Sequence, residues 1–302
     1  PSSLAIFGVR GANGVIIITT KKAKEGKTQV SINGSVGWKK VTDRVSLTNA
    51  EQFKMLYNEQ RMNQGGDPYD YTVWNADTDW QDEMFQTGFL TNNTVSITAS
   101  GDRSKFYLGY VMEEGSIKSE KLNKFTVNLH SEHKVTDFLR FGFQVNGVRA
   151  LYPDAKGVGS ALKAAPIAPV YDAESGLLHT LPDFQRAQVW NPMIEPVLKG
   201  AHNKSANYRM AGNIYGELDL MKNLTFKATF SLDYASSQSR SYSPLIYVYN
   251  PDVEGGKERL TDKESISQSK STSMAAQSDY VLTYINQFGD HGLTLTAGLT
   301  TN

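Results

Sequence analysis

The residues best suited to chemistry lie in one stretch, between Asp67 and Glu83. It combines carboxylates with aromatic rings, which together can hold a sugar or a cation. Four side chains are the candidate ligand-facing set: Tyr69, Tyr71, Trp74 and Asp77. The alternative is a structural loop whose rings pack inside the protein, and the sequence favours this alternative.

Other chemistry is poorly supported. The chain has no cysteine, which removes disulfides, thiolate metal sites and cysteine nucleophiles. His130 and His133 are three apart in a predicted strand and therefore face opposite sides, so they do not predict a metal site. No catalytic motif or pair of carboxylates in fixed geometry is evident, so we expect neither an enzyme nor a bound cofactor.

Charge and glycine spacing exclude two further classes. The 31 basic and 31 acidic side chains balance, which gives no reason to expect nucleic-acid binding. Residues 8–14 are rich in glycine but precede a strand-like run at 15–18, whereas a phosphate cradle requires a helix at that point.

The main structural signal is repeated alternation of apolar and polar residues. In residues 29–38, Val30, Ile32, Val36 and Trp38 share one face of the predicted strand. The same pattern predicts eight more strands, at 94–100, 105–112, 125–134, 138–148, 207–220, 224–234, 271–286 and 293–299. Several reach the roughly 9 to 11 residues of a tilted membrane-spanning strand.

The connections between these strands alternate between long and short. Long loops are predicted at about 41–91, 152–206 and 236–270, with tight turns between them. Helices are predicted at 50–63, capped by Thr48 or Asn49, and at 158–165. This rhythm is typical of an all-β, up-and-down antiparallel transmembrane barrel. A soluble β-sandwich or a surface adhesin is the alternative.

The N-terminal residues carry a resemblance. The run Ala5–Lys22, which includes Gly8-Val9-Arg10-Gly11-Ala12-Asn13-Gly14, resembles the end of the plug domain in SusC/RagA-type TonB-dependent transporters. Family members usually have tyrosine in place of Phe7 and a small residue in place of Val9. Further stretches resembling the family lie at 78–88, 105–117 and 164–172.

The resemblance implies an architecture. Residues 1–26 would be the C-terminal end of a plug, with Arg10 and Asn13 as plug–barrel contacts, and residues 27–302 the first part of a barrel with long extracellular loops. The expected barrel has 22 strands, of which this chain would supply about nine. The sequence is therefore expected to be a fragment of a longer polypeptide.

The resemblance also implies a function. Members import glycans or peptides across the Gram-negative outer membrane, in Bacteroidota-type bacteria, with energy from the TonB complex. Expected partners are a SusD-like surface lipoprotein, an oligosaccharide or peptide ligand and outer-membrane lipid. Two such transporter–lipoprotein pairs would form a dimer.

Overall fold

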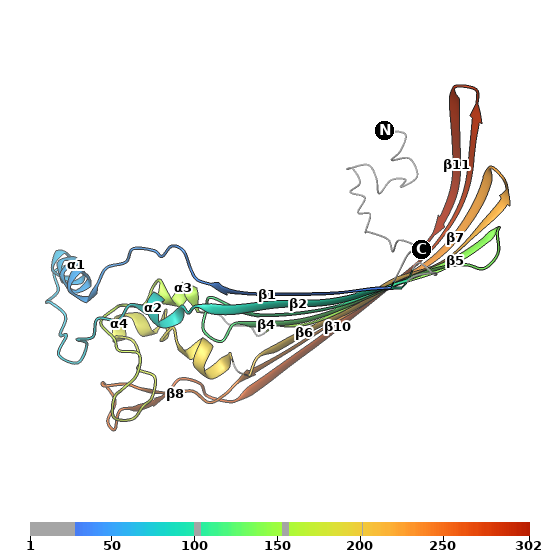
Figure 1. Ribbon diagram of the computed structural model, residues 1–302. Coiled ribbons are helices and arrows are strands. Elements are labelled where there is room, and N and C mark those ends of the chain that lie inside the picture. The colour runs from blue at the N-terminus through green and yellow to red at the C-terminus, as the bar shows by residue number, and fades with distance from the viewer. Residues whose placement is uncertain (1–27, 100–103, 153–156, 201) are drawn as a thin grey trace.

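A computed structural model of the protein describes residues 28–99, 104–152, 157–200 and 202–302. Its main feature is one large antiparallel sheet, and the helices and long loops of the described residues gather beyond one end of it (Figure 1). The predicted plug segment 1–26, including Arg10 and Asn13, lies outside the described residues.

Nine strands form the large sheet, in the order β1-β2-β3-β4-β5-β6-β7-β10-β11. Each pairs antiparallel with the next along the chain, apart from the short β8 and β9. Their bounds are β1 Gln29–Lys39, β2 Gly88–Ala99, β3 Ser104–Glu114, β4 Lys121–Lys134, β5 Leu139–Tyr152, β6 Lys204–Met221, β7 Leu224–Ser243, β10 Ser265–Phe288 and β11 His291–Thr301. The predicted up-and-down antiparallel sheet of nine strands is confirmed.

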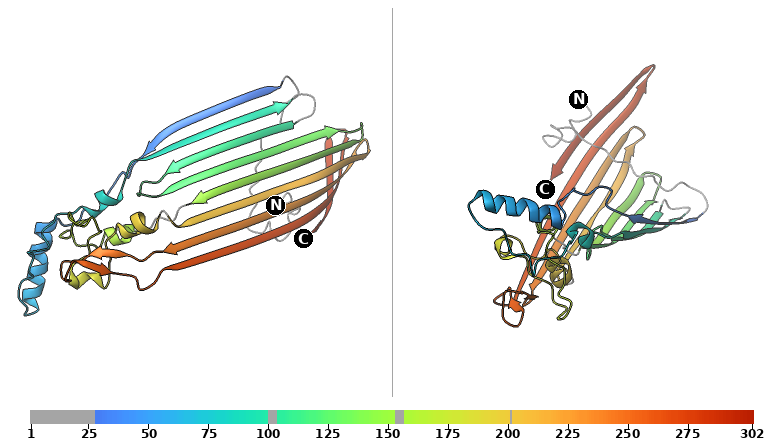
Figure 2. Two further views of the ribbon diagram at one scale, coloured as in Figure 1. Left: turned by 90° about the horizontal axis from the view of Figure 1, so that it is seen from below. Right: turned by 90° about the vertical axis from the view of Figure 1, so that its left-hand side faces the viewer.

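Two layers of packed sheet, as a β-sandwich requires, are not found among the described residues. The sheet is a single curved layer, and β1 and β11 are its two edges (Figure 2). In the same part of the chain, no helix combines the length and the apolar character needed to cross a lipid bilayer.

Alternation gives the sheet two different faces. On the apolar face, Ile32 and Trp38 of β1 are 76% and 72% exposed, and Phe230 of β7 and Leu295 of β11 are also exposed. The opposite, polar face carries charged and amide side chains such as Asn128 of β4. Apolar side chains left in contact with solvent along a whole sheet face indicate a surface made for an apolar environment.

The third long loop is shorter than predicted. Strands β7 and β10 continue to Ser243 and from Ser265, so the connection is 244–264 rather than 236–270. The extension pairs serine with serine: Ser237 with Ser271, Ser239 with Ser269 and Ser241 with Ser267. A strand that is polar on both faces has no alternation, which is why the sequence pattern ended early.

The predicted helix at 50–63 is confirmed as α1, Ala50–Asn63. The helix predicted at 158–165 is shorter, α3 Val158–Ala161. Four further elements had no clear sequence signal: α2 Trp80–Met84, α4 Asp183–Arg186, the π-helix Ile194–Lys199 and the hairpin of β8 Tyr247–Tyr249 with β9 Lys257–Arg259.

One glycine on the polar face is required by close packing. A Cβ at Gly142 would lie 2.4 Å from the Tyr215 ring on the neighbouring strand. That ring lies beneath the Lys227 ammonium, 4.3 Å from its centroid, and its hydroxyl donates to Glu132 at 2.9 Å. Any larger residue at 142 must displace the ring and these contacts.

We therefore expect Gly142→Val to destabilise the sheet by about 1 to 3 kcal/mol, as overpacking does. Gly216→Val is the matched control, because a Cβ at Gly216 has no neighbour within 4 Å. Thermal unfolding followed by circular dichroism measures both. Equal midpoints for the two variants would contradict the packing argument.

Candidate functional site

The candidate site is the assembly of loops at one end of the sheet, which we call the loop cap: residues 41–87, 157–200 and 244–264. All helices of the described chain and the β8–β9 hairpin belong to it (Figure 1). Long connections gather there because every second connection is a tight turn at the other end of the sheet.

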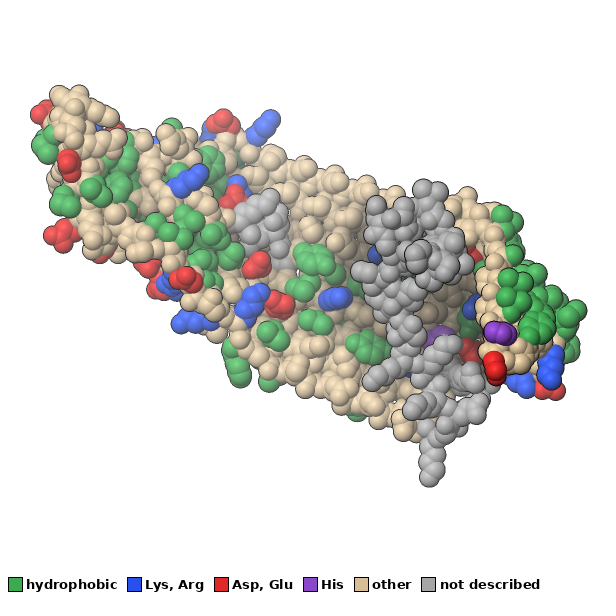
Figure 3. Space-filling model, turned by 90° about the horizontal axis from the view of Figure 1, so that it is seen from above, with side chains coloured by type: hydrophobic (Ala, Val, Ile, Leu, Met, Phe, Trp, Pro, Cys, Tyr) green, Lys and Arg blue, Asp and Glu red, His purple; other side chains and the backbone are tan. Residues whose placement is uncertain are grey.

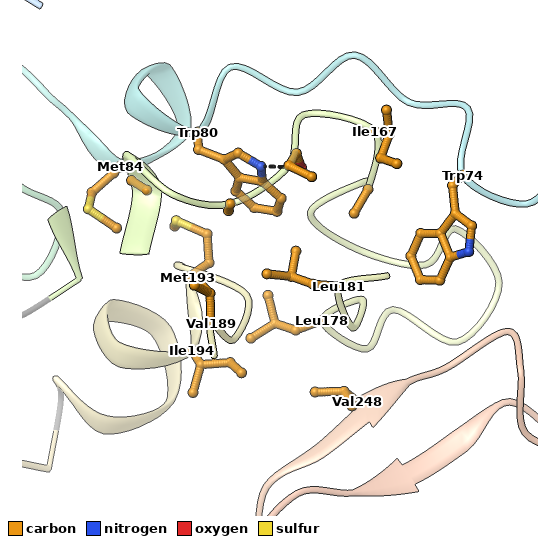
Figure 4. Close-up of a cluster of buried hydrophobic side chains, with 14 of the residues drawn as sticks. Trp74, Trp80, Met84, Ile167, Leu178, Leu181, Val189, Met193, Ile194 and Val248 are labelled. Atoms are coloured by element: carbon orange, nitrogen blue, oxygen red, sulfur yellow. Dashed lines mark hydrogen bonds between the residues drawn. The ribbon is translucent and has the colours of Figure 1, made fainter. Parts of the chain in front are cut away.

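The loop cap has its own hydrophobic core. Buried side chains from all three loops pack together, and Trp74, Met84, Ile167 and Val248 are at most 1% exposed (Figure 4). Loops that bury this much apolar surface hold a defined shape.

Helix α2 joins two of the loops. Asp79 caps it by accepting hydrogen bonds from the Gln81 and Asp82 amides. The cap points Trp80 inward, where its indole N–H donates to the Ala165 carbonyl at 3.0 Å (Figure 4). This bond joins the first loop to the second, 85 residues further along the chain, beside backbone bonds from the Ala76 and Thr78 amides to the Ile167 and Pro166 carbonyls.

Helix α1 is fixed by its N-terminus. Asn49 and Gln52 form a reciprocal capping box, so of the two predicted caps the structure uses Asn49. Asp77 accepts a hydrogen bond from the Ala50 amide at 2.8 Å. A carboxylate at this point also complements the positive end of the helix dipole.

Aromatic rings gather between α1, the following loop and α4; this aromatic cluster consists of Phe53, Tyr57, Tyr69, Tyr71 and Phe184. Tyr57 and Phe184 stack with ring centroids 4.3 Å apart, and Tyr69 meets Phe184 edge-on at 5.2 Å. All five are half-buried, so part of each ring is open to solvent.

The two tyrosine hydroxyls of the candidate ligand set are engaged. Tyr69 donates to Asp183 at 2.8 Å and Tyr71 to Asn58 at 3.0 Å. Burial raises the pKa of both phenols, and for Tyr69 the bond to the Asp183 carboxylate raises it further. Both remain neutral donors at physiological pH.

The other two candidates lie deeper. Trp74 is 1% exposed and packs edge-on against His179 at 5.2 Å. Asp77 is occupied by the start of α1. The structure thus brings Tyr69 and Tyr71 together, and places Trp74 and Asp77 as supports of the same loop.

A cavity of about 470 Å³ opens beside these residues, between segments 44–49, 77–81 and 162–166. Its lining residue Arg44 is paired, 2.9 Å from Asp82 and 3.9 Å from Asp79, whereas Lys163 forms no ion pair with another described residue. The Gln81 amide bonds both backbone groups of Val45. Arg44 therefore offers little free charge to an ionic ligand.

The polar face of the sheet is lined by ion pairs between neighbouring strands. Arg140 of β5 bonds Glu217 and Asp219 of β6, and Arg209 of β6 bonds Asp233 of β7 at 3.0 Å. Viewed from above, basic and acidic side chains are scattered over the visible face, with hydrophobic side chains between some of them (Figure 3). Such exposed pairs contribute little stability but keep the wall hydrophilic.

Metal binding finds no support in the part of the chain that the structure describes, which holds no group of three potential metal-ligating side chains. His130 and His133 are three residues apart in β4, and an odd spacing along a strand places their side chains on opposite faces of the sheet.

Trp80→Phe should lower the free energy of unfolding by about 1 to 3 kcal/mol, because the buried Ala165 carbonyl loses its donor. Trp190→Phe is the control, since Trp190 is 41% exposed. The measurement is the thermal unfolding midpoint. If Trp80→Phe shifts it no more than Trp190→Phe, the bond does not hold the loops together.

A pH dependence follows from His179, which is 4% exposed and bonds the Thr180 carbonyl at 2.9 Å. Burial lowers its pKa below the usual value near 6.5. The unfolded chain therefore takes up a proton at a higher pH than the folded one. Stability of the loop cap is fully present above about pH 6.5 and is lost as pH falls through the folded-state pKa.

Hydrogen exchange of the loop-cap amides between pH 7.5 and 5 tests this, after correction for the intrinsic rate. Protection should fall at low pH in the native protein and stay flatter in His179→Gln. His202→Gln is the control: it replaces a histidine outside the loop-cap core and should retain the native profile.

No family model matches the chain. It is 28% identical over 315 aligned residues to TonB-dependent receptor P3 of Formosa agariphila, which covers 98% of the chain and 29% of that receptor. It is 33% identical over 180 residues to TonB-dependent receptor SusC of Bacteroides thetaiotaomicron, covering 57% of the chain and 18% of SusC.

Solved structures share the fold. The RagAB peptide importer in its open-open state superposes with a TM-score of 0.80 at 16% identity, over 99% of this chain and 37% of that one. Its closed-closed state gives 0.76. The chain thus spans less than a third of the two receptors named and little more than a third of the importer chain. These relatives are receptors and importers by name, in line with the expectation of no enzymatic activity.

Proposed function

Because this chain corresponds in sequence and fold to part of the SusC/RagA-type TonB-dependent transporters, we propose that its protein actively imports an oligomeric nutrient across the outer membrane of a Gram-negative bacterium. The observation that carries the proposal is the sheet itself. One face is apolar and exposed, the other is hydrophilic, and all long loops lie at one end. A wall between lipid and an aqueous path has these properties.

The loop cap is the proposed outer entrance. Its own core gives it a fixed shape, and the half-buried aromatic cluster offers ring faces at its surface. Tyr69 and Tyr71 would contact the ligand, while Trp74 and Asp77 hold their loop. Ring faces beside neutral hydroxyls suit a sugar ring or an apolar peptide side chain, so both a glycan and a peptide remain candidates.

The remaining parts of the proposal come from the resemblance to SusC/RagA-type transporters. RagAB is a peptide importer by name, and SusC is a TonB-dependent receptor. By analogy, residues 1–26 would end a plug held to the wall through Arg10 and Asn13. The TonB complex would supply energy, and a SusD-like lipoprotein would cover the loop cap, with two such pairs forming a dimer.

Uptake by cells that produce the full protein tests the proposal with two probes, fluorescent neutral malto-oligosaccharides and a fluorescent peptide pool. We expect uptake of one probe that stops when a protonophore dissipates the energy gradient. The folded protein should also migrate differently on gels before and after heating in detergent.

Replacing Tyr69 and Tyr71 by alanine should reduce uptake about 3- to 10-fold per ring, the range of a lost aromatic contact. Phenylalanine at both positions retains the rings and is the control. Surface binding of a probe without any energy-dependent uptake would favour the adhesin alternative.

A further inference from the structure

Three basic side chains gather at the loop-cap end of the apolar face: Lys204 of β6, Arg240 of β7 and Lys270 of β10. We call them the basic triad. Lys204 pairs directly with Arg240 in the strand register. Lys270 pairs with Gln238, two residues from Arg240 on the same face. Directly paired residues lie about 5 Å apart and diagonal ones about 7 to 8 Å, so the three form one group.

The triad continues the apolar face. In the unbroken register, Lys204, Arg240 and Lys270 have the same parity as Met210, Tyr234 and Met274, which are 51%, 37% and 70% exposed. They follow the last of these apolar residues by four to six positions, about 13 to 20 Å along the strand. They therefore lie near the loop-cap end of the apolar face, with Tyr242 and the 62% exposed Ile266 beyond them on β7 and β10.

The positive charge of the triad is not neutralised locally. Within the described chain, none of the three forms an ion pair, and all are exposed. The apolar face of β6, β7 and β10 carries no carboxylate between the triad and the apolar band. The neighbouring carboxylate, Glu264, lies beside the Tyr242 hydroxyl.

Two like charges placed opposite each other in a sheet destabilise it. Lys204 and Arg240 are in this arrangement, with Lys270 adding a third charge, and an external anion between them would remove the repulsion. Because the basic triad borders an apolar surface, it favours an anion that is covalently attached to an apolar group.

We propose that the basic triad binds the phosphate-bearing headgroup of a lipid in the membrane leaflet on the loop-cap side. Arg149 of β5 adds a further cation on the same face, nearer to the apolar residues. Its guanidinium lies 5.9 Å from the Tyr208 ring centroid. Acyl chains would cover the apolar residues below, and the phosphates would meet the cations. The inference rests on the proposed outer-membrane location but not on transport or on any nutrient.

The test uses the full protein, purified in a nonionic detergent and titrated with phosphatidylglycerol or phosphatidylcholine. Native mass spectrometry counts the bound lipid. Each cation near a membrane surface strengthens the binding of anionic lipid about 5-fold. The variant Lys204→Gln/Arg240→Gln/Lys270→Gln should thus bind phosphatidylglycerol about 100-fold more weakly, with its binding of phosphatidylcholine unchanged.

Two controls separate charge from general damage. Lys204→Arg/Arg240→Lys/Lys270→Arg keeps the charges and should keep the preference for phosphatidylglycerol, as should Lys222→Gln at the opposite end of β6 and β7. A glutamine variant that still prefers phosphatidylglycerol overturns the proposal. So does displacement of the lipid by an equal concentration of inorganic phosphate, which would indicate a site for the free anion.

Failure here is distinguishable from failure of the proposed function. A protein that shows heat-dependent migration and energy-dependent uptake, yet no lipid preference, refutes only the lipid site. A protein with neither migration change nor uptake refutes the transporter itself.

Discussion

Backbone pairing across the nine strands is the constraint on which the rest of the structure depends. Each inner strand pairs with the strands on both sides, the edge strands β1 and β11 pair on one side only, and the register has one irregularity, between Asp219 and Met221. Because that pairing is nearly unbroken, side chains alternate faithfully over the whole sheet. An apolar face and a hydrophilic face are the direct result.

The packing of the molecule is inverted as a consequence. The strands expose their large apolar residues, while the buried core of the described chain lies almost wholly in the loops, around Trp74, Trp80 and Met84. This core explains why carboxylates and rings in the 67–83 stretch are mostly structural. Asp77 and Asp79 stabilise helix starts, and the indole of Trp80 ties two loops together.

Sequence reasoning recovered the sheet well, because period-two alternation and loop length are direct expressions of pairing and environment. The resemblance to SusC/RagA-type transporters is confirmed by relatives that match along most of the chain. The serine-paired ends of β7 and β10 escaped notice, because a strand wet on both faces has no alternation. The roles of Tyr69 and Trp74 could not be separated either, since their exposure depends on Phe184 and His179, more than a hundred residues away.

The strands differ greatly in length, and this shapes the edge of the wall at the tight-turn end. β1 has 11 residues and β10 has 24, which corresponds to about 36 Å and 80 Å along each strand. Through the paired residues of the intervening strands, Gln29 of β1 aligns with Gln277 of β10, so eleven residues of β10, about 36 Å, extend past β1 at the tight-turn end. At the loop-cap end Val36 aligns with Lys270, and β10 is longer by only two residues there. The loop cap therefore rests on a nearly level edge, whereas the opposite edge of the wall is stepped.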